Sequence, residues 1–294
     1  MRRVRVGITV GDPAGIGPEI AARAAADVRV REVCEPVLFA PADLTGVRLG
    51  QESAGGGRAA YEVITRAVEA ARRGDVHAIA TAPISKRALA LAGLPWKGHT
   101  DLLAHLCGVE HVRMLFYADR ARPLCVTLAT VHVRLAEVPR LLSTTEVCRT
   151  IVMTAGWLTG LGVVSPRVAL AGLNPHAGEG GLFGDEEEQV LRPAVAAARD
   201  QGVEASGPWP GDTVFLRATR GEFDAVVACY HDQGLIPVKL LAFGEAVNVT
   251  IGLPIVRTSV DHGTAFDIAG RGTADAGSLV AAVRLAARLA EARR

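Results

Sequence analysis

The chain has 294 residues, of which 49% are hydrophobic, 21% are charged and 4% are aromatic. This apolar content supplies a full core and excludes a disordered chain, and the length predicts two domains or one large one. Because the formal net charge is only +1, a nucleic-acid-binding protein is not expected. No apolar run reaches the roughly 20 residues of a membrane span. The longest, from Ile151 to Val164, predicts a core helix.

Short runs rich in Val, Ile and Ala alternate with longer helical patterns along the chain. Strands are predicted at 4–10, 77–81, 126–131, 168–173 and 225–230. Helices are predicted to start near Pro18, and to cover 58–73, 184–200 and 278–294. Apolar strands between helices are typical of a largely parallel sheet that is covered on both faces. The sequence therefore predicts an α/β fold, and two domains without a linker would share a discontinuous boundary.

The five cysteines are an odd number and include no Cys-x-x-Cys pair. Cys107, Cys125 and Cys229 lie in apolar surroundings, as reduced core thiols do. We therefore expect a soluble, cytoplasmic protein.

Three histidines follow predicted strands directly or after a few residues: His132, His176 and His231. In open α/β sheets, ligands bind at the carboxyl edge of the strands. Three imidazoles with an open fourth position make a catalytic divalent-metal site, for which Zn²⁺ is the commonest occupant. Each histidine could instead be an ordinary polar residue at a strand end. The pattern alone supports these two interpretations about equally.

Two glycine-rich loops are candidate ligand contacts. Residues 174–181 contain three glycines after His176 and allow a close backbone approach, although a surface turn would look similar. Residues 11–18 follow a strand and open a helix, where free N–H groups can meet an anion. This loop is not the dinucleotide fingerprint, because Ile20 stands where the third glycine is required, and the chain has no P-loop.

A set of polar residues suits a phosphorylated substrate: His99, Thr100, Lys239, Asn248 and Arg257. Cations balance the charge of a phosphate, and Thr and Asn add neutral hydrogen bonds. Lys239 and Arg257 could equally be solvated surface charges. Asp232 could orient the adjacent His231, act as a base, or cap the following turn.

Six segments together resemble the 4-hydroxythreonine-4-phosphate dehydrogenase family of pyridoxal phosphate (vitamin B6) biosynthesis. They are TVGDPAGIGPE (9–19), TAPISK (81–86), GHT (98–100), GLNPHAGEGG (172–181), YHDQG (230–234) and GLPIVRTSVDHGT (252–264). They occur in the family's order over nearly the whole chain. Residues 41–58 are shorter than the family pattern, and Val131 and Arg134 depart from it beside the first histidine, which bears on substrate identity.

The resemblance implies a fold like that of isocitrate and isopropylmalate dehydrogenases, with two α/β/α domains around a cleft. We expect residues 1–125 and 265–294 in the first domain and 126–264 in the second. The resemblance implies that His132, His176 and His231 hold the metal. It likewise implies that His99, Thr100, Lys239, Asn248 and Arg257 contact substrate. Zn²⁺ is the expected metal, Mg²⁺, Mn²⁺ or Co²⁺ would also suit, and NAD (or NADP) would bind without a glycine fingerprint.

The implied enzyme is a homodimer whose metal site takes ligands from both subunits. Its implied reaction is the NAD-dependent oxidation and decarboxylation of 4-phosphohydroxy-L-threonine to 3-amino-2-oxopropyl phosphate. Lys239 and Asp232 are candidates for removing the hydroxyl proton. One alternative is the same chemistry on 4-phospho-D-threonate, 4-phosphoerythronate or a dihydrodiol. The others are a three-histidine zinc hydrolase and a non-catalytic binding protein.

Overall fold

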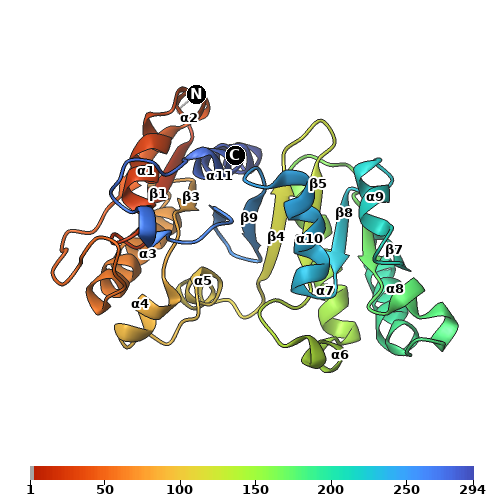
Figure 1. Ribbon diagram of the computed structural model, residues 1–294. Coiled ribbons are helices and arrows are strands. Elements are labelled where there is room, and N and C mark those ends of the chain that lie inside the picture. The colour runs from red at the N-terminus through yellow and green to blue at the C-terminus, as the bar shows by residue number, and fades with distance from the viewer. Residues whose placement is uncertain (1–2) are drawn as a thin grey trace. The chain divides into compact units, whose positions relative to one another are not determined.

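The computed structural model describes residues 3–294, which form two compact units (Figure 1). Of the described residues, unit 1 comprises 3–112 and Val247–Arg294, and unit 2 comprises Arg113–Ala246. The strands of each unit are covered by helices on both faces, which confirms the predicted α/β class.

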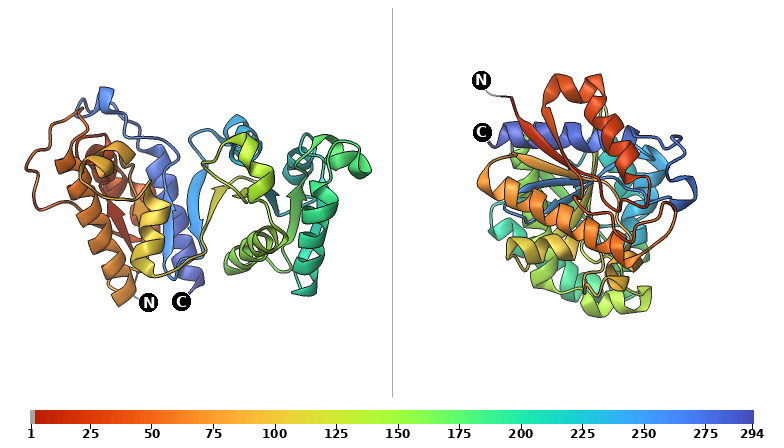
Figure 2. Two further views of the ribbon diagram at one scale, coloured as in Figure 1. Left: turned by 90° about the horizontal axis from the view of Figure 1, so that it is seen from below. Right: turned by 90° about the vertical axis from the view of Figure 1, so that its left-hand side faces the viewer.

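Unit 1 contains strands in the order β2-β1-β3-β10-β9, and all neighbours are parallel except β10 and β9. The strands are β1 (Arg5–Thr9), β2 (Glu35–Phe39), β3 (Ala78–Thr81), β9 (Val247–Ile251) and β10 (Val256–Ser259). The helices are α1 (Gly17–Ala26), α2 (Val28–Val33), α3 (Ala54–Arg73), α4 (Lys86–Leu91), α5 (His99–Cys107) and α11 (Gly277–Ala292). Helices α3 and α5 pack on one face of the sheet, and α11 covers the other (Figure 2).

Unit 2 contains strands in the order β4-β5-β8-β6-β7, of which only β4 and β5 pair antiparallel. The strands are β4 (Arg113–Ala118), β5 (Leu124–Leu128), β6 (Arg167–Ala171), β7 (Glu204–Trp209) and β8 (Ala225–Ala228). The helices are α6 (Val138–Leu141), α7 (Thr144–Gly160), α8 (Arg192–Asp200), α9 (Val214–Thr219) and α10 (His231–Ala242). Helices α7 and α8 cover one face, and α9 and α10 cover the other.

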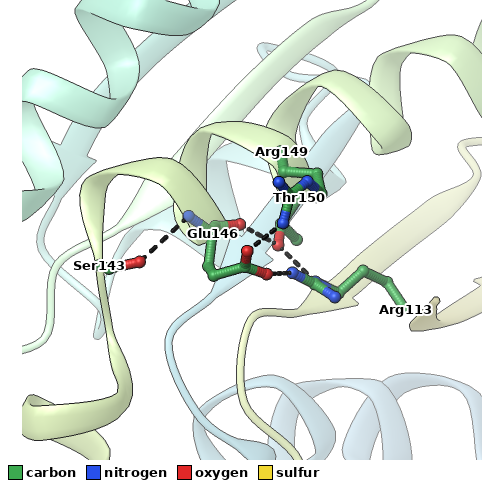
Figure 3. A network of polar contacts seen from close by, with 5 residues as sticks. All are labelled: Arg113, Ser143, Glu146, Arg149 and Thr150. Carbon is green, nitrogen blue, oxygen red and sulfur yellow. Dashed lines mark hydrogen bonds and ion pairs between the residues drawn. The ribbon is translucent and has the colours of Figure 1, made fainter. Parts of the chain in front are cut away.

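The first strand of unit 2 is tied to α7 by a polar network (Figure 3). Arg113, at the start of β4, donates from Nε to Thr150 Oγ1 at 2.7 Å and pairs with the Glu146 carboxylate. The same carboxylate pairs with Arg149, and Ser143 caps α7 by accepting the Glu146 N–H. The network fixes the entry of the chain into unit 2.

The five predicted strands are present as β1, β3, β5, β6 and β8. The predicted helices are also present, and the apolar run from Ile151 lies in α7, which ends at Gly160. The helix predicted from Gly184 starts instead with a π-helical turn, Glu187–Leu191, that leads into α8. No helix among residues 3–294 is long and apolar enough to cross a membrane.

Both domain boundaries in the structure differ from the predicted ones. The first lies between residues 112 and 113 rather than 125 and 126, because β4 pairs along its length with β5 of unit 2. The second lies between residues 246 and 247 rather than 264 and 265, because β9 and β10 join β3 in unit 1. Asn248 and Arg257 therefore belong to unit 1.

Candidate active site

Two of the three histidines singled out by the sequence lie side by side in unit 2. His132 follows β5, and His231 is the first residue of α10, which Cys229 and Tyr230 connect to the end of β8. Because β5 and β8 are parallel neighbours, their carboxyl ends meet at one edge of the sheet. The two imidazole ring centroids are 5.5 Å apart. Imidazoles that share one metal ion through N–metal bonds of about 2 Å have a similar spacing, so this pair can supply two ligands.

Asp232 orients the His231 ring. Its Oδ1 lies 2.6 Å from His231 Nδ1, and 74% of its side chain is exposed. A carboxylate at Nδ1 favours the tautomer that carries a proton there, which leaves Nε2 as an acceptor for a metal. Of the roles considered for Asp232, the geometry therefore supports orientation of the imidazole.

His176 does not join the pair within this chain. It follows β6 in a loop that projects outward, and 69% of its side chain is exposed. Its ring contacts Phe183, and its Nδ1 lies 3.7 Å from Glu179 Oε2. Among residues 3–294, no group of three or more His, Cys, Asp or Glu side chains is placed to hold a metal ion. One chain therefore presents two adjacent imidazoles and a third that lies apart.

Two open cavities of about 560 and 630 Å³ adjoin His176. The larger is lined by Asn174, Asp232 and the apolar side chains of Phe215, Ile236 and Leu240, among others. Ile236 and Leu240 are strongly exposed on α10, and Phe243 continues the same exposed stripe beyond the end of the helix. A polar histidine loop thus stands beside an uncovered apolar helix face.

Unit 1 carries a buried guanidinium on β10. Arg257 is 2% exposed and donates from Nη1 to Thr250 Oγ1 at 2.8 Å and from Nη2 to Thr81 Oγ1 at 2.7 Å. Burial lowers its pKa to about 9, so the group remains protonated at neutral pH. Both bonded partners are neutral hydroxyls, and its Nε lacks a partner. A desolvated cation without a carboxylate is arranged to accept an anion.

The alternative that Arg257 is a solvated surface charge is therefore wrong. The sequence pattern did not identify its hydroxyl partners, Thr81 and Thr250. Thr81 lies in the segment TAPISK, and Thr250 faces Arg257 across the β9–β10 pair. The available sequence signal for Thr250 was its position two residues after Asn248, because residues two apart on β9 share one face of the sheet.

His99 and Asn248 place further unpaired polar atoms in unit 1. His99 begins α5; the residue is partly exposed as a whole, but its Nε2 is buried without a partner. Burial, together with the charge of Arg257, holds the pKa of His99 well below its usual value, so the ring is neutral. Asn248 Oδ1 is also buried without a partner, and Asn248 pairs in register with Ser259 on β10. Thr100 follows His99 and is partly exposed.

Lys239 is the one predicted substrate contact that lies in unit 2. It is half-buried on α10, with its Nζ 5.7 Å from the Phe243 ring centroid. The remaining predicted contacts lie in unit 1: His99, Thr100, Asn248 and Arg257.

The loop at residues 11–18 joins the end of β1 to α1. A Cβ at Gly11 would lie 2.2 Å from Pro83 O, and one at Gly17 would lie 1.9 Å from Val10 O, so both positions require glycine. A largely apolar cavity of about 300 Å³ lies beside this loop, lined by Val10, Pro13, Pro18, Leu44 and Leu49, among others. An apolar cavity next to the N-terminus of α1 can take a flat ring system with an attached anion.

The chain resembles known dehydrogenases over almost its full length. A family described as pyridoxal phosphate biosynthetic protein PdxA matches residues 11–286. The 4-hydroxythreonine-4-phosphate dehydrogenase of Beijerinckia indica is 46% identical over 319 residues, covering 96% of this chain and 94% of that protein. The D-threonate 4-phosphate dehydrogenase of Salmonella typhimurium is 43% identical over 330 residues, covering 99% of this chain and all of that protein (100%).

Solved structures agree. The 4-hydroxythreonine-4-phosphate dehydrogenase of Klebsiella pneumoniae matches with a TM-score of 0.87 at 40% identity, covering 99% of this chain and 98% of that one. A β-decarboxylating dehydrogenase from Thermococcus kodakarensis shares the fold alone, with a TM-score of 0.50 at 15% identity over 97% of this chain and 81% of that one. The predicted α/β fold is thereby confirmed as one that a β-decarboxylating dehydrogenase shares. The chain belongs to the PdxA family of dehydrogenases.

Proposed function

We propose that this protein catalyses the NAD-dependent and divalent-metal-dependent oxidation and decarboxylation of 4-phosphohydroxy-L-threonine to 3-amino-2-oxopropyl phosphate. The observation that carries the proposal is the buried Arg257, which has two neutral hydroxyl partners and no carboxylate. A site of this kind favours an anionic substrate, and the 46%-identical relative is named for a phosphorylated one.

The phosphate would be held by charge and by neutral donors together. Arg257 supplies the positive charge, and the unpaired His99 Nε2 and Asn248 Oδ1 offer a donor and an acceptor to the rest of the substrate. Thr100 and Lys239 complete the set that the family resemblance implies. Because the His99 ring is neutral, it can bond substrate without adding a second charge beside Arg257.

The metal would be held by His132, His231 and the partner subunit's His176. The 5.5 Å spacing of the first two rings fits two ligands of one ion, and the exposed third histidine is free to serve another copy. The exposed stripe of Ile236, Leu240 and Phe243 beside the histidine loop supports a homodimer that buries this face. Zn²⁺ is the expected metal, and Mg²⁺, Mn²⁺ and Co²⁺ also suit imidazole ligands.

When bound, the metal supplies Lewis acidity at the substrate hydroxyl, and NAD is the hydride acceptor. The apolar cavity beside α1 is our candidate position for part of the nucleotide. Asp232 bonds His231 Nδ1, so we assign it to orientation of that ring and keep Lys239 as the candidate that moves the hydroxyl proton. Oxidation of the substrate hydroxyl gives a 3-keto acid, which then loses CO₂. NAD (or NADP) as the cofactor and the cytoplasmic location remain predictions.

A second candidate is the same chemistry on 4-phospho-D-threonate. The 43%-identical relative from Salmonella typhimurium is named for this substrate. Both substrates carry a phosphate that Arg257 could bind, so this residue does not separate them. A dihydrodiol without an acidic group would leave the buried guanidinium without an anionic partner, which counts against an uncharged dihydrodiol.

The test is NADH formation by metal-loaded protein with each phosphorylated substrate in parallel. A preference for 4-phosphohydroxy-L-threonine that is lost with a chelator supports synthesis of the vitamin B6 precursor. A preference for 4-phospho-D-threonate keeps the mechanism and moves the protein to a catabolic role. Turnover without NAD would instead support a zinc hydrolase, and binding of substrate without turnover would support a binding protein.

The metal site has its own test in the variant His176→Ala. Removing one of three ligands should abolish metal-dependent oxidation while the fold is kept. Wild-type turnover of this variant would contradict the three-histidine site.

A further inference from the structure

The loop that carries His176 has an unusual backbone. Residues 176–181 all have positive φ angles, from 44° at Glu179 to 97° at Gly181. Three of them, His176, Ala177 and Glu179, are not glycine, and side chains at such angles are strained. A strained segment of this kind persists only where its surroundings hold it in place.

The group that holds this loop in place is the carboxylate of Glu187, at the start of the π-helical turn that precedes α8. Glu187 is 1% exposed. Its Oε1 accepts the backbone N–H of Leu173 at 2.8 Å and that of Asn174 at 2.7 Å. Its Oε2 accepts Nδ2 of the Asn174 side chain at 2.9 Å. These three bonds hold the chain two residues before His176, where Pro175 restricts the backbone further.

The loop is also packed directly against this carboxylate. A Cβ at Gly178 would lie 2.8 Å from Glu187 Oε2, and one at Gly172 would lie 2.9 Å from Ala177 Cα. The Asn174 carbonyl accepts the N–H of Ala177, which closes the turn around His176. His176 thus stands on a turn whose two sides both rest on Glu187, while its own ring points outward.

We propose that Glu187 is a positioning residue that fixes the direction of the His176 imidazole for metal binding. This inference rests on the proposed function, because it takes His176 as a metal ligand. Glu187 acts through the backbone of residues 173–178 and the Asn174 side chain, and has no direct role toward metal or substrate. A carboxylate is suited to this task because it accepts several N–H groups at once without donating to any.

The test is Co²⁺ binding by metal-free, full-length protein, followed through the visible absorption of the bound ion. In Glu187→Gln the side chain keeps its shape, but an amide NH₂ replaces one of the accepting oxygens. We expect Co²⁺ affinity to fall by about 10- to 100-fold, as when an outer partner of a ligating histidine is changed. Glu188→Gln is the matched control, because Glu188 is the exposed neighbour that pairs with Arg192 on the surface. It should change Co²⁺ affinity less than about twofold.

A double-variant cycle separates positioning of His176 from a general loss of structure. His176→Ala should weaken Co²⁺ binding at least as much as Glu187→Gln, and the two changes together should weaken it no further than His176→Ala alone. If Glu187→Gln does not fold, Asn174→Ala is the substitute: it removes one of the three bonds to Glu187, together with the bond from Asn174 Nδ2 to Glu186 Oε2, and should show a smaller loss with the same non-additivity.

The outcomes that overturn the inference are distinct. If His176→Ala lowers Co²⁺ affinity and Glu187→Gln does not, the positioning role is wrong and the metal site stands. If the two effects add, Glu187 acts through something other than His176. If His176→Ala leaves Co²⁺ affinity unchanged, the proposed metal site and this inference both fail.

Discussion

The two units present their polar groups in opposite ways. In unit 1, Arg257 and the Nε2 of His99 are buried, and the strands β3 and β9 supply fixed neutral partners for the guanidinium. In unit 2, the histidines stand on loops or at a helix start, and the side chains of His176 and Asp232 are mostly exposed.

This difference indicates when each group is desolvated. The unit 1 groups have already lost water on folding, so an anion that reaches Arg257 meets a cation that is prearranged and weakly screened. The unit 2 imidazoles remain hydrated until an ion or a second copy covers them. Variants in unit 1 should therefore act mainly on substrate, and variants in unit 2 mainly on metal.

The largest effect is expected for Arg257→Met, which keeps the volume and removes the charge. Two lost charge-assisted bonds to a phosphate correspond to a fall in kcat/KM of about 10²- to 10⁴-fold. Because Arg257 has no carboxylate partner, its replacement by an apolar side chain should leave the free energy of unfolding unchanged or raise it. Steady-state kinetics test the predicted fall in kcat/KM, and thermal unfolding tests the predicted effect on stability.

A loss of stability in that variant, with kcat/KM unchanged, would assign Arg257 a purely structural role. Arg257→Lys is the companion variant. It keeps the charge but cannot reach Thr81, Thr250 and a ligand in one plane, so it should recover only part of the lost activity.

A smaller effect is expected for Asp232→Asn in unit 2. The change keeps an oxygen acceptor for His231 Nδ1 and removes the charge that favours this tautomer. We expect Co²⁺ affinity to fall about 10-fold. This is the lower end of the range for residues that orient a metal-ligating histidine, because the Asp232 carboxylate is 74% exposed. Asp200→Asn, at the exposed end of α8, is the control. Equal affinities for Asp232→Asn and the control would show that the 2.6 Å contact does not tune the ring.

The sequence predicted the framework of both units but not their boundary. Apolar runs such as 225–230 identify buried strands because both faces of the sheet are covered. Strands β2, β4, β7, β9 and β10 were not predicted. In β9 and β10, polar residues interrupt the apolar pattern, and two of these residues, Asn248 and Arg257, are candidate substrate contacts. Sequence periodicity thus fails where the fold places polar chemistry inside a sheet.

The candidate metal site was predicted only in part for a related reason. The strand ends correctly place His132 beside His231, because β5 and β8 are neighbours. His176 also follows a strand that neighbours β8, yet the left-handed turn carries its ring away from the pair. The glycines at 178, 180 and 181 indicate a turn, but local composition does not give the direction of a turn that is held by Glu187, a residue more distant in the chain.

A pH experiment tests whether burial of His99 in unit 1 affects the stability of the fold. The pKa of folded His99 lies well below the usual value because of burial and the nearby Arg257. As the pH falls below about 6.5, the unfolded chain takes up a proton at this residue and the folded chain does not. The free energy of unfolding should therefore decrease on acidification, by up to about 1.4 kcal/mol per pH unit from this residue.

Urea unfolding of the wild type and His99→Gln between pH 5 and 8 measures this contribution. The variant should lose part of the slope below pH 6.5, and the two curves should run parallel above it. Curves that are parallel over the whole range would show that His99 takes up its proton equally in both states.

The smallest effect is expected in the network that ties β4 to α7 (Figure 3). Burial would raise the pKa of Glu146, but its bonds to Arg113 and Arg149 outweigh this and lower the pKa below its usual value. The pairing therefore stabilises the fold above pH 4 to 5 and is lost as the carboxylate becomes protonated. Because 40% of the Glu146 side chain is exposed, solvent screens the pair.

Glu146→Gln should lower the free energy of unfolding by only about 0.5–1 kcal/mol, and the difference from wild type should shrink in 1 M salt. Glu188→Gln breaks the exposed ion pair with Arg192, one helical turn away, and should lower the free energy of unfolding by about 0.3–0.5 kcal/mol. A cost above about 3 kcal/mol for Glu146→Gln would mean that the network behaves as a buried ion pair. In that case, fixed and desolvated charge would not be confined to unit 1, and the contrast between the units would have to be restricted to their ligand-facing groups.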